Sequence, residues 1–378
     1  GLSGAYLPSV ARHHGLRPEL ALPELDALLD RFGFVIYPNM LSQQRQTNRG
    51  SYALICGDFP EVVTAVPKMT RIAEAGLEID CLPRRLAENG YRTAYVQAAP
   101  LDFMHKRQFM PLAGYEHQMG REDFLARGLR SEGWGPGDVD FLAAAVDRIR
   151  LLAASDEPWF ATLLNVGTHH PFHNSSEDEP VLPDGARPLP ERRIEAFRVM
   201  VEALEQTLES LHEDGLLDDT LVILTADEAG GFQEHSGREL VLHNNFGMLA
   251  LRLPDRVPFP GLAPRDRIVA QVDIPLTVLD LLGIARGSGM VGRSLLDRPV
   301  ERRRGLLFGD TYLARSYFLY EDGELIDCDE SLLRCRVWSF DPLRLFGSLQ
   351  RSEQSVRLSL EARQRIVEEA ARIRVMPQ

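Results

Sequence analysis

Two adjacent carboxylates, Asp227 and Glu228, follow a short apolar segment at residues 221–224. The segment is typical of a buried strand, and in an open α/β sheet functional groups gather where the strands end. Neighbouring carboxylates suit a divalent cation, because hard cations prefer oxygen ligands. Taken alone, such a pair is more often a solvated acidic turn. It is therefore a candidate metal site that needs support from the rest of the chain.

A second polar cluster contains His169 and His170, in the loop that follows the apolar run at residues 159–166. Imidazole side chains at the end of a buried strand can bind a metal or an oxyanion. A histidine that merely hydrogen-bonds within its loop is the commoner case for either residue alone.

A third cluster, at residues 46–51, contains Thr47 and Arg49 ahead of a helix expected through residues 53–56. A hydroxyl near a helix N-terminus and beside an arginine can act as a nucleophile once a metal lowers its pKa. The alternative is a threonine that only caps the helix.

These clusters need a scaffold of alternating strands and helices. Apolar residues recur at three- and four-residue steps through residues 191–213 and predict a long helix. The continuous apolar run at 159–166 is typical of a strand buried on both faces. Further strands are expected at 34–37, 92–97, 220–226 and 247–253, and further helices at 23–31, 83–89, 141–153 and 274–282. The alternation predicts a doubly wound α/β fold with a mainly parallel sheet.

The pattern of expected strands and helices changes after residue 293. Residues 305–310 and 316–327 read as antiparallel strands, and 358–373 as a polar helix. We therefore divide the chain into a main α/β domain at 1–300, which carries the three polar clusters, and a small C-terminal α+β subdomain at 301–378.

The charge balance limits the partners. The 42 Lys+Arg residues stand against 55 Asp+Glu, a net charge of −13, whereas nucleic-acid binding usually needs a basic face. An anionic substrate stays compatible, because a bound cation can dominate the local field. No apolar run approaches the ~18 residues of a membrane span. The start at Gly1, with no signal peptide, leads us to expect a segment of a longer protein.

The four cysteines form two local pairs, Cys56 with Cys81 and Cys328 with Cys335. Local pairing fits two disulfides in an oxidising compartment, and it fits four separate buried thiols equally well.

The motifs are more specific in combination, and their order resembles the alkaline phosphatase/sulfatase superfamily over roughly residues 1–300. Within it, the resemblance is to lipoteichoic-acid-synthase-like phosphoglycerol transferases and to phosphoethanolamine transferases. The matching segments are C-G-D-F-P at 56–60, N-G-Y-R-T at 89–93, F-M-H-K at 103–106, W-G at 134–135, H-H-P-F at 169–172, D-E at 227–228, E-H at 234–235, L-H at 242–243, the run at 273–283 and G-R-S-L at 292–295.

The resemblance implies roles for individual residues. Thr47 falls where sulfatases place a modified cysteine or serine, and it would be the nucleophile. A divalent metal (Mn²⁺, Mg²⁺ or Zn²⁺) would be bound by Thr47, Asp227 and Glu228. Glu228 stands where the family usually has histidine, and a carboxylate favours Mn²⁺ or Mg²⁺ over Zn²⁺. The implied substrate-binding residues are Arg49, Lys106, His169 and His243.

The implied reaction is metal-dependent transfer of a phosphoglycerol or phosphoethanolamine head group. The donor would be a phospholipid, the acceptor an envelope glycan or lipid, and the intermediate a covalent phosphothreonine. Two other functions stay open: a sulfatase-like hydrolase of phosphate or sulfate esters, and a non-catalytic sulfatase-like binding domain.

In the family, an opening strand ends in a metal-binding glutamate just before a segment like Leu2-Ser3. We therefore expect that strand, its glutamate and any membrane anchor to lie upstream of Gly1. The implied location is the cell envelope, on the periplasmic or extracytoplasmic face.

An envelope location also favours the disulfides Cys56–Cys81 and Cys328–Cys335. The segment from Cys81 to Arg85 reads C-x-P-x-R, the sulfatase formylglycine pattern. It lies in the wrong place for the chemistry, and we interpret it as coincidence.

Overall fold

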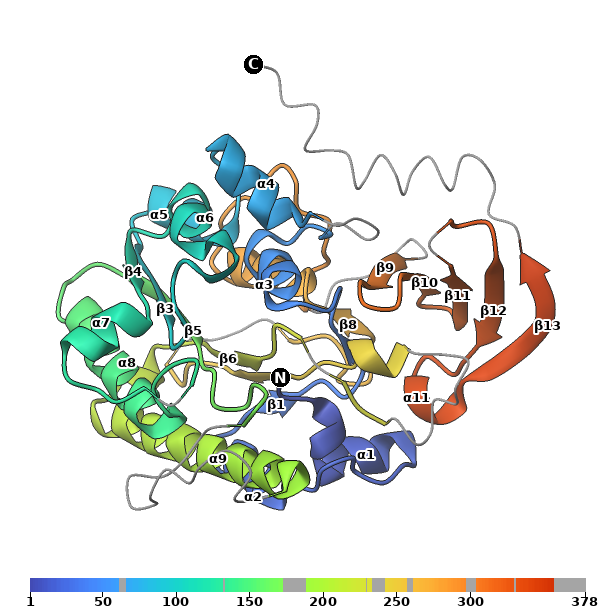
Figure 1. Ribbon diagram of the computed structural model, residues 1–378, viewed down its shortest axis with the longest axis horizontal. Helices are drawn as coiled ribbons and strands as arrows, with labels where there is room; N and C mark the ends of the chain where they lie inside the picture. Colours follow the sequence, from blue (N-terminus) through green and yellow to red (C-terminus); the bar gives the residue numbers. More distant parts are fainter. Residues whose placement is uncertain are drawn as a thin grey trace.

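A computed structural model describes residues 1–60, 66–131, 133–172, 188–228, 230–232, 242–256, 261–296, 304–329 and 331–356 (Figure 1). Most of them form an α/β part with helices on both sides of a central layer of strands. The remainder, from residue 305 onward, forms a separate antiparallel sheet beside it.

One half of the central layer is parallel. Strand β3 (Arg92–Gln97) lies between β4 (His117–Met119) and β5 (Trp159–Leu164), and both pairings are parallel. A further short parallel pair joins β2 (Met40–Leu41) to β8 (Val269–Ala270). This half has the predicted strand direction.

The other half contains β6 (Val222–Thr225), which pairs antiparallel with β7 (Leu249–Arg252). Strand β7 also pairs antiparallel with β1 (Val35–Ile36), giving the order β1-β7-β6. The doubly wound α/β class is confirmed, with an antiparallel portion that the sequence pattern did not predict.

The helices cover both faces of the central layer, with α8 and α9 on one side and α3, α5 and α6 on the other (Figure 1). Helix α9 has the predicted apolar stripe, and Phe197, Val201 and Leu208 in that stripe are buried. The helices are α1 (Pro8–His14), α2 (Pro23–Arg31), α3 (Thr47–Cys56), α4 (Lys68–Ala75), α5 (Leu82–Glu88), α6 (Lys106–Leu112), α7 (Arg121–Ala126), α8 (Asp138–Ala153), α9 (Leu189–Glu213) and α10 (Asp273–Leu281). No helix in these described ranges has both the length and the apolar character of a membrane span.

One expectation about β5 is wrong. The run at 159–166 predicted a strand buried on both faces, but the residues of β5 are only half-buried. Among the described residues β5 pairs with β3 alone, so its other edge faces a cavity. Strand β6 is half-buried for the same reason.

The C-terminal sheet is antiparallel, in the order β13-β12-β11-β10-β9. Its strands are β9 (Gly305–Asp310), β10 (Arg315–Tyr320), β11 (Glu324–Cys328), β12 (Cys335–Ser339) and β13 (Gln350–Val356), with α11 (Leu345–Ser348) between the last two. The prediction for 305–310 matches β9, whereas 316–327 is two strands separated by a turn. The helix predicted at 358–373 and the boundary predicted at 300 lie outside the described residues.

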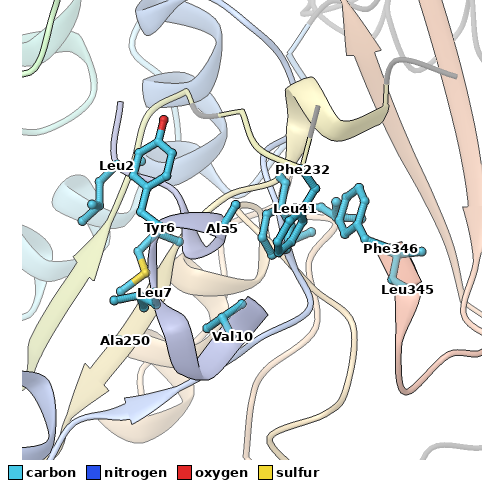
Figure 2. Close-up of a cluster of buried hydrophobic side chains, with 14 of the residues drawn as sticks. Leu2, Ala5, Tyr6, Leu7, Val10, Leu41, Phe232, Ala250, Leu345 and Phe346 are labelled. Atoms are coloured by element: carbon cyan, nitrogen blue, oxygen red, sulfur yellow. The ribbon is translucent and has the colours of Figure 1, made fainter. Parts of the chain in front are cut away.

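The first residues of the chain pack between the α/β part and this sheet. Figure 2 shows Leu2, Tyr6 and Val10 in one apolar cluster that also includes Phe232 and Phe346. The cluster buries residues from α1, from the loop after β6 and from α11. It fixes the start of the chain next to the central layer of strands.

Both predicted disulfides are present. Cys56 and Cys81 are 4.0 Å apart between Cα atoms, and Cys328 and Cys335 are 4.1 Å apart. The first bridge joins the last residue of α3 to the residue that precedes α5. The second links β11 to β12.

Candidate functional site

The first turn of α3 lies on the loop that follows β6. Thr47 is the first residue of α3, and the backbone N–H of Gln46 before it donates a 2.6 Å hydrogen bond to the Glu228 carboxylate. One turn into the helix, a Cβ built on Gly50 would be 1.7 Å from the Asp227 carbonyl oxygen. Only glycine permits this approach, which brings the helix start against the two predicted metal ligands.

The loop after β6 is held by its carbonyl groups. The buried Gln271 side chain donates 2.8 Å hydrogen bonds to the carbonyl oxygens of both Ala226 and Asp227. These hydrogen bonds hold the main chain of the loop and do not involve the Asp227 carboxylate. The arrangement is suited to holding carboxylates at a defined place at the sheet edge.

Lys106 begins α6 and is only 1% exposed. Burial lowers its pKa to about 8, against the opposing effect of the Asp227 carboxylate. Its ammonium lies 5.2 Å from the centre of the Phe103 ring, and it has no hydrogen bond or ion pair with any described residue. A buried ammonium without a paired carboxylate is suited to receive an anion.

His169 lies in an ordered loop after β5. The buried Asp138 carboxylate holds that loop by accepting hydrogen bonds from Asn165 and from the N–H of Gly167. His169 Nδ1 lies 2.6 Å from the His170 carbonyl oxygen, so Nδ1 donates and Nε2 is left as the second ring nitrogen.

Aromatic rings support the side chain of His169. The Trp134 ring lies 5.3 Å from the His169 ring and 4.9 Å from the Phe103 ring, so a row of rings leads from His169 towards Lys106.

One cavity of about 950 Å³ brings most of the predicted residues together. Its lining includes five of the seven predicted site residues: Thr47, Lys106, His169, Asp227 and Glu228. The structure does not place the other two there. Arg49 is buried and its Nε donates to the Gln46 side chain, while His243 lies in the short 3₁₀ helix η4 (Leu242–Asn245). Their substrate-binding roles stay predictions.

Sequence reasoning missed a contribution from the C-terminal sheet. Arg45 lies 3.7 Å from the buried Asp310 carboxylate at the end of β9, and its guanidinium stacks 4.9 Å from the Tyr312 ring. Burial raises the pKa of Tyr312, and the nearby Glu228 carboxylate raises it further. The turn after β9 therefore lies beside the candidate site. No local pattern in the sequence indicates a contact between segments about 270 residues apart.

The donor set fits a hard cation. Two carboxylates and a hydroxyl are oxygen ligands, and Mg²⁺ or Mn²⁺ is usually bound by one or two carboxylates with water and phosphate completing the shell. Within the described ranges, no group of three or more His, Cys, Asp and Glu side chains is arranged to hold a metal. The predicted motif at 234–235 lies outside those ranges. Cys81, in the C-x-P-x-R segment, is disulfide-bonded and is therefore not a free thiol.

The fold and the polar residues that line this cavity define an α/β enzyme domain of the alkaline phosphatase superfamily, with the composition of a phosphotransferase or hydrolase site. The chain belongs to the sulfatase family, whose family model matches residues 13–284.

Individual relatives agree with this membership. The lipoteichoic acid synthase-like protein YvgJ of Bacillus subtilis is 22% identical over 313 residues, which cover 77% of this chain and 49% of that protein. Phosphoglycerol transferase I of Xanthomonas campestris is 30% identical over 131 residues, 33% of this chain and 18% of its own. The chain thus spans about half or less of the length of these relatives.

A solved structure supports the fold. The crystal structure of an alkaline phosphatase superfamily protein from Vibrio parahaemolyticus superposes with a TM-score of 0.70 at 20% identity. The match covers 98% of this chain and 82% of that one.

Proposed function

We propose that this chain transfers a phosphoglycerol or phosphoethanolamine head group from a phospholipid to a hydroxyl of an envelope glycan or lipid. One observation carries the proposal: Thr47, two carboxylates and the buried ammonium of Lys106 line the same cavity. The names of the relatives, a lipoteichoic acid synthase-like protein and a phosphoglycerol transferase, support this class of substrate.

In the first step Thr47 Oγ attacks the phosphorus, and the bond to the diacylglycerol oxygen breaks. Diacylglycerol leaves with a proton, and the head group stays on Thr47 as a phosphodiester. In the second step an acceptor hydroxyl attacks the same phosphorus and loses its proton. The bond to Thr47 Oγ then breaks, and Thr47 regains a hydrogen.

The chain's own residues balance the charge of both steps. Lys106 is a cation below a pKa of about 8 and lies where non-bridging phosphate oxygens would enter. His169 Nε2 is suited to contact a phosphate oxygen or the entering hydroxyl. A divalent cation bound by Thr47, Asp227 and Glu228 would supply Lewis-acid stabilisation and favour the Thr47 alkoxide.

The two disulfides support an extracytoplasmic location, because such bonds persist in oxidising compartments. Membrane association would come from segments outside residues 1–378. The net charge of −13 makes nucleic acid an unsuitable partner, because nucleic-acid binding usually needs a basic face.

The test incubates the full-length protein with phosphatidylglycerol or phosphatidylethanolamine and searches by mass spectrometry for a head-group adduct on the peptide containing Thr47. Wild type and Thr47→Ser should form the adduct, and Thr47→Ala should not. An adduct on another residue, or turnover by Thr47→Ala, would overturn the proposal. Turnover that rises with added glycan or lipid acceptor supports a transferase, and turnover that ignores the acceptor supports the hydrolase.

A further inference from the structure

Two buried glutamines connect the segment before Thr47 to the loop after β6. Gln43 lies shortly before α3, and Gln271 directly follows β8. The backbone N–H of Gln43 donates a 2.8 Å hydrogen bond to the side-chain carbonyl oxygen of Gln271. The side-chain amide of Gln271 donates in turn to the carbonyl oxygens of Ala226 and Asp227. One side chain therefore joins the segment that leads to the candidate nucleophile and the loop that carries the candidate metal ligands.

Every polar group of the Gln271 side chain is used in this connection. A primary amide has two N–H donors and one carbonyl acceptor. In Gln271 the donors bind two carbonyl oxygens of one loop, and the acceptor binds an N–H of the other segment. A carboxylate at this position would only accept, and an apolar side chain would do neither. A buried amide with all its groups paired therefore favours a single placement of the two segments.

The same segment is attached to the C-terminal sheet. Gln43 Nε2 donates a 3.2 Å hydrogen bond to the Leu307 carbonyl oxygen in β9, and the Gly309 N–H donates a 2.9 Å bond to the Gln43 carbonyl oxygen. Just beyond the end of β9, the Thr311 N–H donates a 3.0 Å bond to the Gln44 side chain. Hydrogen bonds thus run without a break from β9 through Gln43 and Gln271 to the loop after β6.

These contacts lie behind the site and do not reach into it. Neither Gln43 nor Gln271 is among the described residues that line the cavity, so neither side chain would contact substrate. They join the two segments that meet where the Gln46 N–H donates to the Glu228 carboxylate, one residue before Thr47. Any change in the spacing of the two segments would therefore act at that contact.

We propose that Gln271 and Gln43 are positioning residues, which hold the start of α3 against the loop after β6 and attach both to β9. The inference rests on the proposed function, which makes Thr47 the nucleophile and assigns Asp227 and Glu228 to a cation. It makes the C-terminal sheet part of the support of the site. The competing account is that the two glutamines only satisfy buried backbone groups. Their loss would then lower stability and leave the geometry of the site unchanged.

The first experiment compares wild type and Gln271→Met in the full-length protein. Methionine keeps the length of the side chain and removes its donors and its acceptor. Residue-level amide hydrogen exchange in metal-free buffer should become about 10-fold faster at Gln43, which loses its acceptor, and also at Gln46. Gln271 does not accept from the Gln46 N–H, whose acceptor is Glu228, so faster exchange there reports displacement of the loop.

The second measurement is the affinity for Mn²⁺, followed by electron paramagnetic resonance of the free ion. Gln271→Met should weaken binding by about 10-fold, because groups that hold metal ligands in place typically contribute that much. Gln271→Asn is the milder variant, since its amide is one methylene too short to reach both segments. It should cause the same two changes to a smaller degree, and it keeps the test decisive where Gln271→Met does not fold.

Gln97→Met is the matched control. Gln97 is equally buried, and its amide donates to the carbonyl oxygens of Ala99 and Pro100 and accepts from the Tyr95 hydroxyl. The substitution removes the same kinds of hydrogen bond after a different strand, β3. It should lower stability about as much as Gln271→Met, while Mn²⁺ affinity and exchange at Gln46 stay within about 2-fold of wild type.

A third variant tests the link to the C-terminal sheet. Gln43→Met removes the bond to Leu307 and should weaken Mn²⁺ binding by about 3-fold. Because both glutamines belong to one connection, the double variant Gln43→Met/Gln271→Met should bind Mn²⁺ within about 2-fold of Gln271→Met alone. Losses that multiply would show two independent supports and would overturn the connection to β9.

The proposal is overturned if Gln271→Met behaves like Gln97→Met, losing stability while Mn²⁺ affinity and exchange at Gln46 stay at the wild-type level. If wild type itself binds no Mn²⁺, exchange at Gln46 decides alone. Both readouts are taken without phospholipid. Failure of wild type to form the Thr47 adduct would therefore overturn the proposed function and leave these results standing.

Discussion

Gly50, in the first turn of α3, lies directly against the main chain of Asp227, where an added Cβ would be 1.7 Å from the carbonyl oxygen. Thr47 and Gly50 are three residues apart and therefore share a face of the helix. The face that carries the candidate nucleophile is thus the face that packs on the candidate metal ligands.

Gly50→Ala should separate these two elements. The clash is with backbone, so the helix or the loop must move, which typically costs about 1–3 kcal/mol of stability. We expect Thr47 adduct formation to fall by at least about 10-fold, because small displacements of positioned groups reduce rates strongly. Gly289→Ala is the control, since no heavy atom lies within 4 Å of its added Cβ. Equal activity of the two variants would contradict the packing argument.

Lys106→Met should reduce turnover by about 10²–10³-fold, because it removes a buried cation from the cavity proposed to bind the phosphate group, while keeping the length of the side chain. Arg107→Met is a matched control in the next position of α6. Its guanidinium is exposed and pairs with Asp102 and Glu122. If both variants retain full kcat/KM for the phospholipid, Lys106 does not contact substrate.

His14 should make the folded state sensitive to mild acid. It is buried against Phe232, Phe246 and Phe346, and burial lowers the pKa of its imidazole to about 4 from 6.5. The unfolded state therefore binds the proton first. The contribution of neutral His14 to the free energy of unfolding is fully present above pH 6.5. It is lost as the pH drops towards 4, which lowers the free energy of unfolding by about 3 kcal/mol.

His14→Gln should remove that share of the pH dependence in denaturant unfolding, measured between pH 7 and pH 4. His13→Gln, at the neighbouring half-buried position, should leave it in place. Parallel pH curves for wild type and His14→Gln would show that His14 does not drive the loss.

The disulfides should differ in their contribution to stability. Cys56–Cys81 closes a sequence separation of 25 and Cys328–Cys335 one of 7. Loop-closure entropy gives about 3.5 kcal/mol for the longer loop and about 2.4 for the shorter one. Double serine variants, compared by denaturant unfolding, should follow that order. A larger loss at Cys328–Cys335 would contradict the loop-length account.

Local periodicity predicted most of the α/β part. Helix α9 and strand β3 appear where their patterns placed them, because repeats of about 3.6 and 2 residues reflect one buried face. The direction of β7 against β6 is set by tertiary pairing, which a single strand's pattern does not encode. Strand β12 was missed because its residues lack a clear apolar alternation.

The site divides in the same way. Motif order led to Thr47 and Lys106, whereas Arg45 and Tyr312 meet only after the C-terminal sheet folds beside the site. Arg49 shows that closeness in sequence to Thr47 does not by itself predict which side chains line the cavity. Two residues along a helix from Thr47, it projects from a different face, and it is buried beside Gln46.

Tyr312 should affect the acceptor more than the donor. It is 59% exposed at the turn after β9, and it stacks on Arg45 close to Glu228. An exposed aromatic ring at the rim of a polar site is a surface on which a sugar or glycerol unit can pack, without contact to the reacting phosphorus. Removing it should weaken acceptor binding by about 1 kcal/mol, roughly 5-fold.

The measurement separates the two half-reactions. For Tyr312→Ala, the KM of the acceptor should rise about 5-fold, while the rate of Thr47 adduct formation without acceptor stays within about 2-fold of wild type. Leu313→Ala is the control, because Leu313 is also exposed on that turn but has no aromatic ring for stacking, and its replacement should leave both rates unchanged. If Tyr312→Ala slows adduct formation and acceptor transfer equally, the turn acts on Thr47 and the candidate metal ligands. Acceptor selectivity would then have to come from elsewhere around the cavity.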